Sequence, residues 1–353
     1  MNTIKTKNKS GFLALLTVML ISMCVAGCVY IDGYSIMQVY NGKEVSYCYA
    51  GDTATFTLTG HIECHQDTQG DQFIFAILVP KAWNLANNSR VTYKCDLADD
   101  RNEELPMDVV PASELPKNGN GLTWAQCLTN QYGVGPNVLD DMEWVVFKTR
   151  AKWDIVNNQF PNYTIYVHVK TAMQNLKCHI GFFVNHTADG FSTSSDHKKV
   201  IYSSECFEVV NGKGATIDFC NNHYNKVSPL SSLQNDFVTL SFMGDVASNK
   251  LANSDVYVES SAFTNSGKVY SVTEKSPKTL MKRSNEHLAT YKITIWPVDF
   301  FKVPHTEYID SIQYQFTNKD RSVVIDQSED DYIQLGTPIP AARKPFKFEF
   351  SCE

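Results

Sequence analysis

The sequence predicts an all-β protein with two tandem β-sandwiches of the immunoglobulin-like or carbohydrate-binding-module-like kind, behind an N-terminal lipid anchor. The 17 tyrosines and 20 phenylalanines are plentiful, whereas long stretches of helix-forming residues are scarce, a balance that favours strands. Short apolar or alternating runs recur between turn residues at the spacing of a sandwich. About 325 residues follow the N-terminal leader, which is enough for two domains that each have a core.

The first 27 residues have the layout of a secretory signal peptide. A lysine-containing start precedes an apolar stretch over 11–26, and Val25-Ala26-Gly27-Cys28 is similar to a bacterial lipobox. This motif predicts lipidation of Cys28 and a place at the outer membrane. The apolar stretch is shorter than the about 20 residues that span a bilayer, so we expect an anchored chain that does not cross it. The alternative is an ordinary cleaved signal peptide with Cys28 unmodified.

The chain divides by composition into four segments after the leader. Residues 28–35 are expected to form a tether, and 36–222 the first sandwich with a long insert at 97–140. A polar, turn-rich stretch over 223–231 indicates a linker, and 232–353 is expected to form the second sandwich.

The strands of the first domain are predicted from periodicity. Residues 53–59 and 163–170 alternate apolar and polar side chains, which is typical of half-buried strands. Residues 73–79 are apolar on both faces and indicate a central strand that ends at Pro80. The other strands expected here are 91–95, 144–149, 178–184, 200–202 and 206–210.

The insert and the second domain give weaker signals. Within the insert, 123–128 predicts a short helix that Thr123 can cap. In the second domain we expect strands at 237–243, 256–258, 268–272, 291–296, 311–316, 323–325 and 346–350.

The cysteines do not predict a metal site. Eight remain after the leader and Cys28, namely Cys48, Cys64, Cys95, Cys127, Cys178, Cys206, Cys220 and Cys352. An exported protein can form disulfides, and buried cysteines also serve as small hydrophobic residues. Glu63-Cys64-His65 and Cys178-His179 place possible ligands side by side, but adjacent strand residues point to opposite faces. We therefore expect no metal and no cofactor.

The sequence contains no recognised catalytic motif. The net charge of −7 and the lack of a dense Lys/Arg stripe argue against nucleic-acid binding. No nucleophile elbow, phosphate loop or His-Glu-x-x-His is present. The acidic cluster Asp140-Asp141-Met142-Glu143 could serve hydrolysis or hold calcium, but a solvated turn is favoured because burying unpaired carboxylates is costly.

A polar loop over 185–197 follows the expected strand 178–184. Asp189-Gly190 forms a turn, and the loop oxygens could bind calcium or contact a sugar. The alternative is an ordered structural loop held by bonds between side chains and the backbone.

Aromatic residues near loops predict a carbohydrate-binding surface, because flat rings can pack on sugar faces beside hydrogen-bonding groups. The segment 296–301 leaves a strand at a proline and combines three aromatic residues with an acid. Burial of the same rings in the core is the alternative. The residues proposed to contact a glycan are Trp296, Asp299, Phe300, Phe301, Trp124 and Trp83.

Five segments are distinctive in combination: Leu78-Val79-Pro80-Lys81-Ala82-Trp83-Asn84, Gly121-Leu122-Thr123-Trp124, Tyr132-Gly133-Val134-Gly135-Pro136-Asn137, Asp141-Met142-Glu143-Trp144-Val145-Val146-Phe147 and Gly181-Phe182-Phe183-Val184-Asn185-His186-Thr187. Over roughly residues 45–220 the chain resembles a family of Bacteroidota lipoproteins with a domain of unknown function, typically encoded beside SusC/SusD-like glycan-uptake pairs. The resemblance implies an accessory role in polysaccharide capture and transfers no catalytic residues. Asp32 is the one acid close after Cys28, which leaves the cell-surface and the periplasmic face both open.

These observations together predict a non-catalytic lipoprotein of the outer membrane that binds a polysaccharide or oligosaccharide beside a SusC/SusD-like complex. Two alternatives stay open. One is a glycoside hydrolase or other envelope enzyme that uses the acidic cluster at Asp140–Glu143, and the other is a structural or adhesive protein that binds other proteins.

Overall fold

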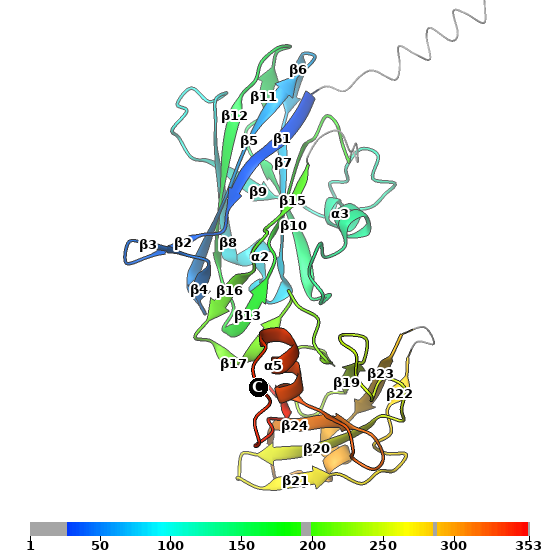
Figure 1. Cartoon of the computed structure of the whole chain (residues 1–353). Coiled ribbons are helices and arrows are strands. Elements are labelled where there is room, and N and C mark those ends of the chain that lie inside the picture. Colours follow the sequence, from blue (N-terminus) through cyan, green and yellow to red (C-terminus); the bar gives the residue numbers. More distant parts are fainter. Residues whose placement is uncertain (1–26, 192–198, 285–287, 352–353) are drawn as a thin grey trace, which may run out of the picture. The chain divides into compact units, whose positions relative to one another are not determined.

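The computed structural model describes residues 27–191, 199–284 and 288–351 (Figure 1). The expected leader and Cys352 lie outside these ranges. The predicted all-β fold is confirmed, and the chain divides into two compact units. The first comprises the residues up to Pro136 with Met142–Ala172 and Cys178–Glu208, and the second comprises Asn137–Asp141, Met173–Lys177 and Val209–Glu353.

The first unit consists mainly of strands. It contains β1 (Gly27–Ser35), β2 (Gln38–Tyr40), β3 (Lys43–Val45), β4 (Tyr47–Tyr49), β5 (Thr53–Cys64), β6 (Thr68–Asp71), β7 (Phe73–Pro80), β8 (Ser89–Cys95), β9 (Leu105–Val109), β10 (Met142–Thr149), β11 (Trp153–Ile155), β12 (Asn162–Lys170), β14 (Gly181–His186) and β15 (Val200–Tyr202). Its helices are a 3-10 turn (Lys81–Trp83), α2 (Leu85–Asn88) and α3 (Trp124–Tyr132). Two further strands, β13 (Gln174–Cys178) and β16 (Phe207–Val210), contain residues of both units.

Nine strands of the first unit form one sheet in the order β1-β5-β12-β8-β9-β10-β7-β14-β15. Every residue of β7 and β14 is buried, which agrees with the expectation of a central core strand over 73–79. Inward side chains from both halves of the sheet, such as Ile165 of β12 and Val184 of β14, line one internal cavity. The sheet therefore folds over on itself, and its two halves pack as the layers of a sandwich.

The expected tether over 28–35 is instead a strand. β1 pairs antiparallel with β5 from Gly27 to Ser35, because Val29 and Ile31 are apolar and bury themselves on the inner face. Tyr163 of β12 fixes this strand in place. Its ring crosses β5 at Gly60, and its hydroxyl donates a 2.6 Å hydrogen bond to the Tyr30 carbonyl of β1.

The long insert contains one element that was expected and one that was not. Thr123 caps the start of α3. Its side chain accepts a hydrogen bond from the backbone N–H of Gln126, and the Gln126 side chain accepts one from the backbone N–H of Thr123. The predicted helix and its cap are confirmed. β9 was not predicted, yet it connects β8 to β10 and so joins the two halves of the sheet.

The second unit has two sheets around its own core. Its elements are β17 (Lys213–Asp218), β18 (Asn225–Ser228), β19 (Val238–Met243), β20 (Tyr257–Thr264), β21 (Val269–Val272), β22 (Lys282–Arg283), β23 (Thr290–Ile295), α4 (Pro297–Phe301), β24 (Ile309–Thr317), β25 (Val324–Ile325), α5 (Gln327–Leu335) and β26 (Phe346–Glu349). One sheet has the order β18-β19-β23-β22, and the other has β21-β20-β24-β25 with β26 also on β24. Rings such as Phe242, Phe316 and Phe346 fill the space between them.

Two expected boundaries differ from the structure. β17 was placed within the first sandwich but belongs to the second unit, and β18 lies inside the expected linker over 223–231. The strands of this stretch could not be predicted from the sequence. Many of its side chains are polar and face solvent or bind one another, so no apolar pattern marks a strand.

A histidine between two aspartates ties α5 to the start of the second unit. The His223 imidazole contacts Asp330 of α5 through Nδ1 and Asp218 through Nε2, the latter at 2.9 Å. Lys177 also lies 2.9 Å from Asp218. Burial opposes the charge on His223, but the hydrogen bonds that its ring donates to Asp218 and Asp330, together with their negative charges, outweigh burial and raise the pKa of His223 to about 9.

Replacing Gly60 by alanine is expected to destabilise the protein by about 2–3 kcal/mol. An added Cβ would lie 2.1 Å from the Tyr30 carbonyl oxygen and 2.3 Å from the Tyr163 hydroxyl oxygen, so the ring must leave its position. Tyr163→Phe removes only the hydrogen bond and should cost about 1 kcal/mol. Urea unfolding measures both, with Thr57→Ala on the outer face of β5 as the control. Equal stability of Gly60→Ala and the parent would contradict this account of β1.

The His223 contacts predict a stability that falls at alkaline pH. A raised pKa means that His223 stabilises the fold below its unfolded value of 6.5, and that this contribution is lost as the pH rises through about 9. The urea midpoint should therefore drop more between pH 6.5 and 9.5 in the parent than in His223→Gln. The exposed His305→Gln serves as the control and should follow the parent. An identical drop in the parent and His223→Gln would show that the imidazole carries no such charge.

Candidate functional site

Two exposed aromatic residues flank one end of the β19–β23 pair. Val238 of β19 pairs with Ile295 of β23, Phe237 directly precedes β19, and Trp296 directly follows β23. Val238 and Ile295 are buried, whereas Phe237 is 68% and Trp296 43% exposed. We call Phe237 and Trp296 the aromatic pair.

Polar groups accompany the aromatic pair. Next to Val238 and Ile295, the Thr239 and Thr294 hydroxyls lie 2.8 Å apart. Asp299, in the first turn of α4, is exposed and 2.6 Å from the Lys302 ammonium, whose hydrogen bond lowers the pKa of Asp299. The surface therefore combines apolar rings with hydroxyls and an ionised carboxylate.

The sequence placed Phe300 and Phe301 on the same platform, but both are buried. Pro297 begins the short helix α4, which turns the chain so that Val298, Phe300 and Phe301 face the core. The two phenylalanine rings pack edge to face, with centroids 5.0 Å apart. Phe237, which is exposed, was not singled out from the sequence, because only the pairing of β19 with β23 places it at the same end of these strands as Trp296.

The other two tryptophans predicted to contact a glycan are core residues. Trp83 is 1% exposed and packs between Phe56 and Phe207. Trp124 is 3% exposed and contacts Phe191. Both tryptophans were predicted to lie near loops. In the structure Trp83 ends the 3-10 turn and Trp124 begins α3, and both side chains face the core. They cannot stack on a sugar.

The acidic cluster has one exposed carboxylate, Asp140, and two partly buried ones, Asp141 and Glu143. The Asp140 side chain is 91% exposed and lies 3.6 Å from the Lys226 ammonium. Asp140 and Asp141 belong to the second unit and Glu143 to β10 of the first. Burial raises the pKa of Glu143, and Lys81 opposes this. The exposure of Asp140 is the arrangement of a surface turn.

The described part of the polar loop after β14 is held by its own side chains. Asn185 donates to the Gly190 carbonyl at 2.6 Å, and Lys199 lies 2.7 Å from Asp189. Asp71 accepts from the Thr187 hydroxyl and the Ala188 N–H, and it contacts the His186 ring. These bonds match the structural alternative for this loop, while residues 192–198 lie outside the described ranges.

The cysteines behave mainly as core residues. Cys206 and Cys220 are disulfide-bonded, so neither offers a thiolate to a metal. Among the described residues, the cysteines outside disulfides are all buried, at Cys28, Cys48, Cys64, Cys95, Cys127 and Cys178. Burial raises the pKa of each of them, which makes them poor metal ligands and weak nucleophiles.

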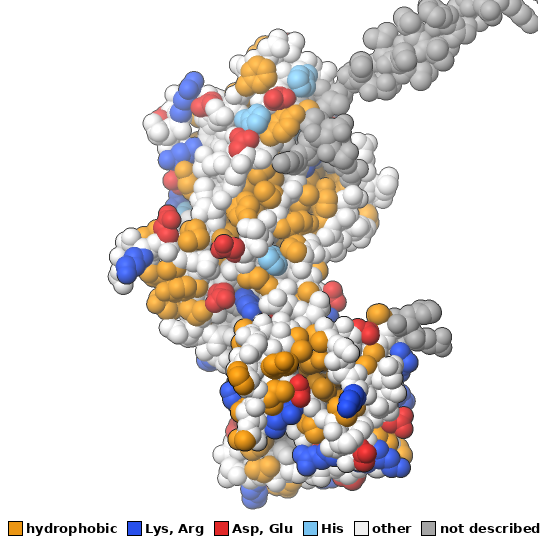
Figure 2. Space-filling view, viewed as in Figure 1, with side chains coloured by type: hydrophobic (Ala, Val, Ile, Leu, Met, Phe, Trp, Pro, Cys, Tyr) orange, Lys and Arg blue, Asp and Glu red, His pale blue; other side chains and the backbone are white. Residues whose placement is uncertain are grey.

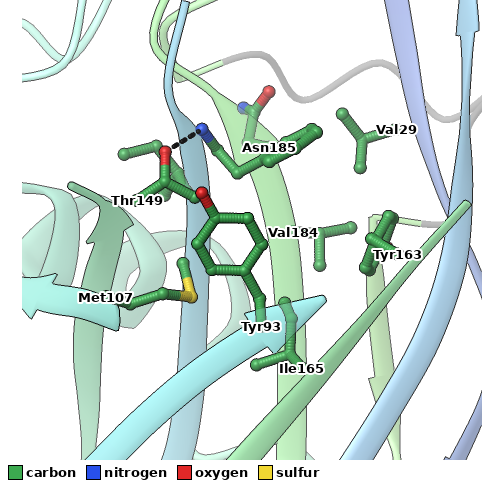
Figure 3. A pocket seen from close by; sticks show the side chains of 10 residues that line it. Val29, Tyr93, Met107, Thr149, Tyr163, Ile165, Val184 and Asn185 are labelled. Carbon is green, nitrogen blue, oxygen red and sulfur yellow. Dashed lines mark hydrogen bonds between the residues drawn. The ribbon is translucent and has the colours of Figure 1, made fainter. Parts of the chain in front are cut away.

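The enclosed cavity of the first unit is too small for a ligand. Figure 3 shows its lining, which is apolar apart from groups such as Thr149 and Asn185. The Thr149 hydroxyl is already used, since it accepts from the Phe73 N–H at 3.1 Å. The volume of about 10 Å³ leaves room for one water molecule at most.

A larger groove, not predicted from the sequence, lies beside the β2–β3 hairpin of the first unit. It has a volume of about 440 Å³ and is lined by Met37, Gln38, Val39, Tyr40, Asp52, Thr53 and Thr55. Figure 2 shows hydrophobic side chains gathered beside this hairpin. Tyr47 and Tyr49 of β4 pack against Tyr40, with ring centroids 5.9 and 4.9 Å from it. We call this feature the tyrosine groove.

A family model described as Domain of unknown function (DUF4961) matches residues 35–223, more than half of the chain. The chain belongs to this family. A second model, Domain of unknown function (DUF8578), matches residues 225–325. The DUF4961 match contains the tyrosine groove, and the DUF8578 match contains the aromatic pair.

Solved structures resemble the chain only distantly. The C-terminal domain of the Streptococcus pyogenes antigen I/II-family protein AspA is 11% identical, with a TM-score of 0.24 over 92% of this chain and 99% of that one. The C-terminal domain of the Streptococcus agalactiae AgI/II polypeptide BspA is 9% identical, with a TM-score of 0.22 over 82% and 95%. AvmM, which catalyses macrocyclization in alchivemycin A biosynthesis, is 10% identical, with a TM-score of 0.25 over 51% and 98%. No curated protein matches the chain. Similarities at this level assign no function to a DUF4961 protein.

Proposed function

We propose that this protein is a non-catalytic, carbohydrate-binding lipoprotein of the bacterial cell envelope. The observation that carries the proposal is the exposure of the aromatic pair. Leaving a large apolar side chain in water forgoes about 1.5–3 kcal/mol that its burial would supply. Two such rings that flank the same end of one strand pair therefore point to a ligand with an apolar face, and the flat face of a sugar ring fits this description.

The polar groups beside the aromatic pair suit sugar hydroxyls. Thr239 and Thr294 can each donate and accept a hydrogen bond, and the Asp299 carboxylate accepts two or more. Hydrogen bonds to a charged acceptor are the stronger kind, so Asp299 would fix the orientation of a sugar that the rings hold. The Asp140 side chain is solvated, which supports binding without hydrolysis.

We place the protein at the cell envelope because its leader is similar to a lipoprotein signal peptide and because the chain resembles SusC/SusD-associated lipoproteins. The natural partners on this proposal are a glycan, the outer membrane through Cys28, and a SusC/SusD-like complex. No helix of the described residues is long and apolar enough to cross a bilayer. Cys28 is 2% exposed at the start of β1, so acylation requires the first residues of β1 to turn away from β5.

Trp296→Ala should weaken polysaccharide binding about 30-fold, the loss expected when a central aromatic contact is removed. The measurement is retardation of the full chain in native gels that contain amylopectin, xyloglucan, mannan or pectin. Tyr332→Ala, which truncates an exposed ring on α5, is the matched control and should migrate like the parent. The proposal fails if no polysaccharide retards the parent, or if Trp296→Ala and the parent are retarded equally.

Cys28→Ala should abolish lipid attachment, because the thiol is the predicted acylation site. Bacteria that express the full chain are grown with a labelled palmitate analogue, and the purified protein is assayed for label. Cys24→Ala, which removes the neighbouring leader cysteine, is the control and should keep the label. Label that persists in Cys28→Ala, or that is missing from the parent, would exclude this anchor.

A further inference from the structure

We infer that the tyrosine groove of the first unit is a second carbohydrate-binding site, separate from the aromatic pair. It shares its ligand class with the proposed function, and it stands on different residues in a different unit. Neither family description assigns a ligand to this surface.

The first observation is a half-buried tyrosine ring in the groove lining, Tyr40, against which the rings of Tyr47 and Tyr49 pack from outside the lining. Tyr40 and Tyr47 stack with an interplanar angle of 12°, and Tyr49 meets them edge to face at 4.9 and 5.7 Å. The rings support one another, so each is held in place while part of its surface stays open. Preorganised aromatic surface of this kind lowers the entropic cost of binding a flat ligand.

The second observation is the tight hairpin that carries Tyr40. Tyr40 pairs with Lys43, and the two residues between them have positive φ, 52° at Asn41 and 75° at Gly42. This is the Asn-Gly turn that matches the twist of a two-residue hairpin. A further bond joins the hairpin to the chain beyond it, since the Tyr49 N–H donates to the Tyr40 hydroxyl at 3.2 Å.

The third observation is polar chemistry beside the Tyr40 ring. Asp52 and Thr53 line the groove and are both exposed, and they supply a carboxylate and a hydroxyl. The Asp52 carboxylate lies 3.5 Å from the Tyr40 hydroxyl, which donates to it. An aromatic ring next to hydrogen-bonding oxygens matches the two kinds of surface on a pyranose. The volume of about 440 Å³ lies within the usual range of small-ligand sites.

The fourth observation argues against an extended peptide as the occupant. A peptide would bind most readily by adding a strand to the open edge of β5, beyond the point where β1 ends. The Gln38 side chain already covers that edge, because its amide donates to the Thr55 carbonyl and accepts from the Thr55 N–H, both at 2.8 Å. The backbone groups that would pair with a peptide are therefore occupied, and a sugar is the occupant that the groove favours.

The test uses the full chain and the same four polysaccharides in affinity gels. Asp52→Asn keeps the shape of the side chain and removes its charge, and Tyr47→Ala removes the ring that stacks with the groove residue Tyr40. Each should weaken binding about 10-fold, and combining Tyr47→Ala with Trp296→Ala should weaken it more than either change alone. Phe160→Ala, an exposed ring of the first unit outside the groove lining, is the control and should bind like the parent.

The outcomes separate this site from the proposed function. If Trp296→Ala weakens binding while Tyr47→Ala and Asp52→Asn do not, the tyrosine groove is not a carbohydrate site and the proposed function stands. If the groove variants weaken binding and Trp296→Ala does not, the groove is the site and the role of the aromatic pair falls. Absence of retardation by every polysaccharide overturns both. Because Asp52→Asn is isosteric, it decides the question even if Tyr47→Ala fails to fold.

Discussion

The first unit depends on one contact that crosses a strand, the hydrogen bond from the Tyr163 hydroxyl to the Tyr30 carbonyl. It exists because Gly60 has no side chain, so a ring from β12 can lie across β5 and reach β1. β1 in turn covers the edge of β5 from Gly27 to Ser35, and the Gln38 amide continues that cover at Thr55. The β2–β3 hairpin follows directly after β1, so the position of the tyrosine groove also depends on this contact.

Much of the fold could be predicted because a half-buried strand shows apolar and polar residues that alternate with a period of two. β12 and β5 alternate as expected, and the apolar run of β7 proved to be buried along its whole length. β1 could not be predicted in this way. It follows the leader directly, and its mixture of apolar and polar residues suggested a tether. β9 and β18 are short, and their pairing partners rather than their own side chains make them strands.

The candidate site was only partly predictable, for a reason that lies in tertiary structure. Trp296, a candidate sugar contact from the sequence, is 43% exposed, whereas Phe300 and Phe301 are buried because the segment after Pro297 is helical. Phe237 lies far from Trp296 in the sequence, and the pairing of β19 with β23 places both residues at the same end of these strands. Tyr47 and Tyr49 alternate visibly in the sequence, yet a hairpin turn is needed to add Tyr40 to them.

The strand that replaces the expected tether has a mechanical consequence. Eight extended residues at 28–35 would let a domain stand off its anchor point by up to about 28 Å and rotate freely there. In β1 the same residues are built into the sheet, and the hydrogen bond from Tyr163 holds them two residues after Cys28. In a protein anchored at Cys28, only the residues that turn away from β5 before Tyr30 would link the lipid to the fold. This short link would limit both the distance and the rotation of the first unit relative to the membrane surface.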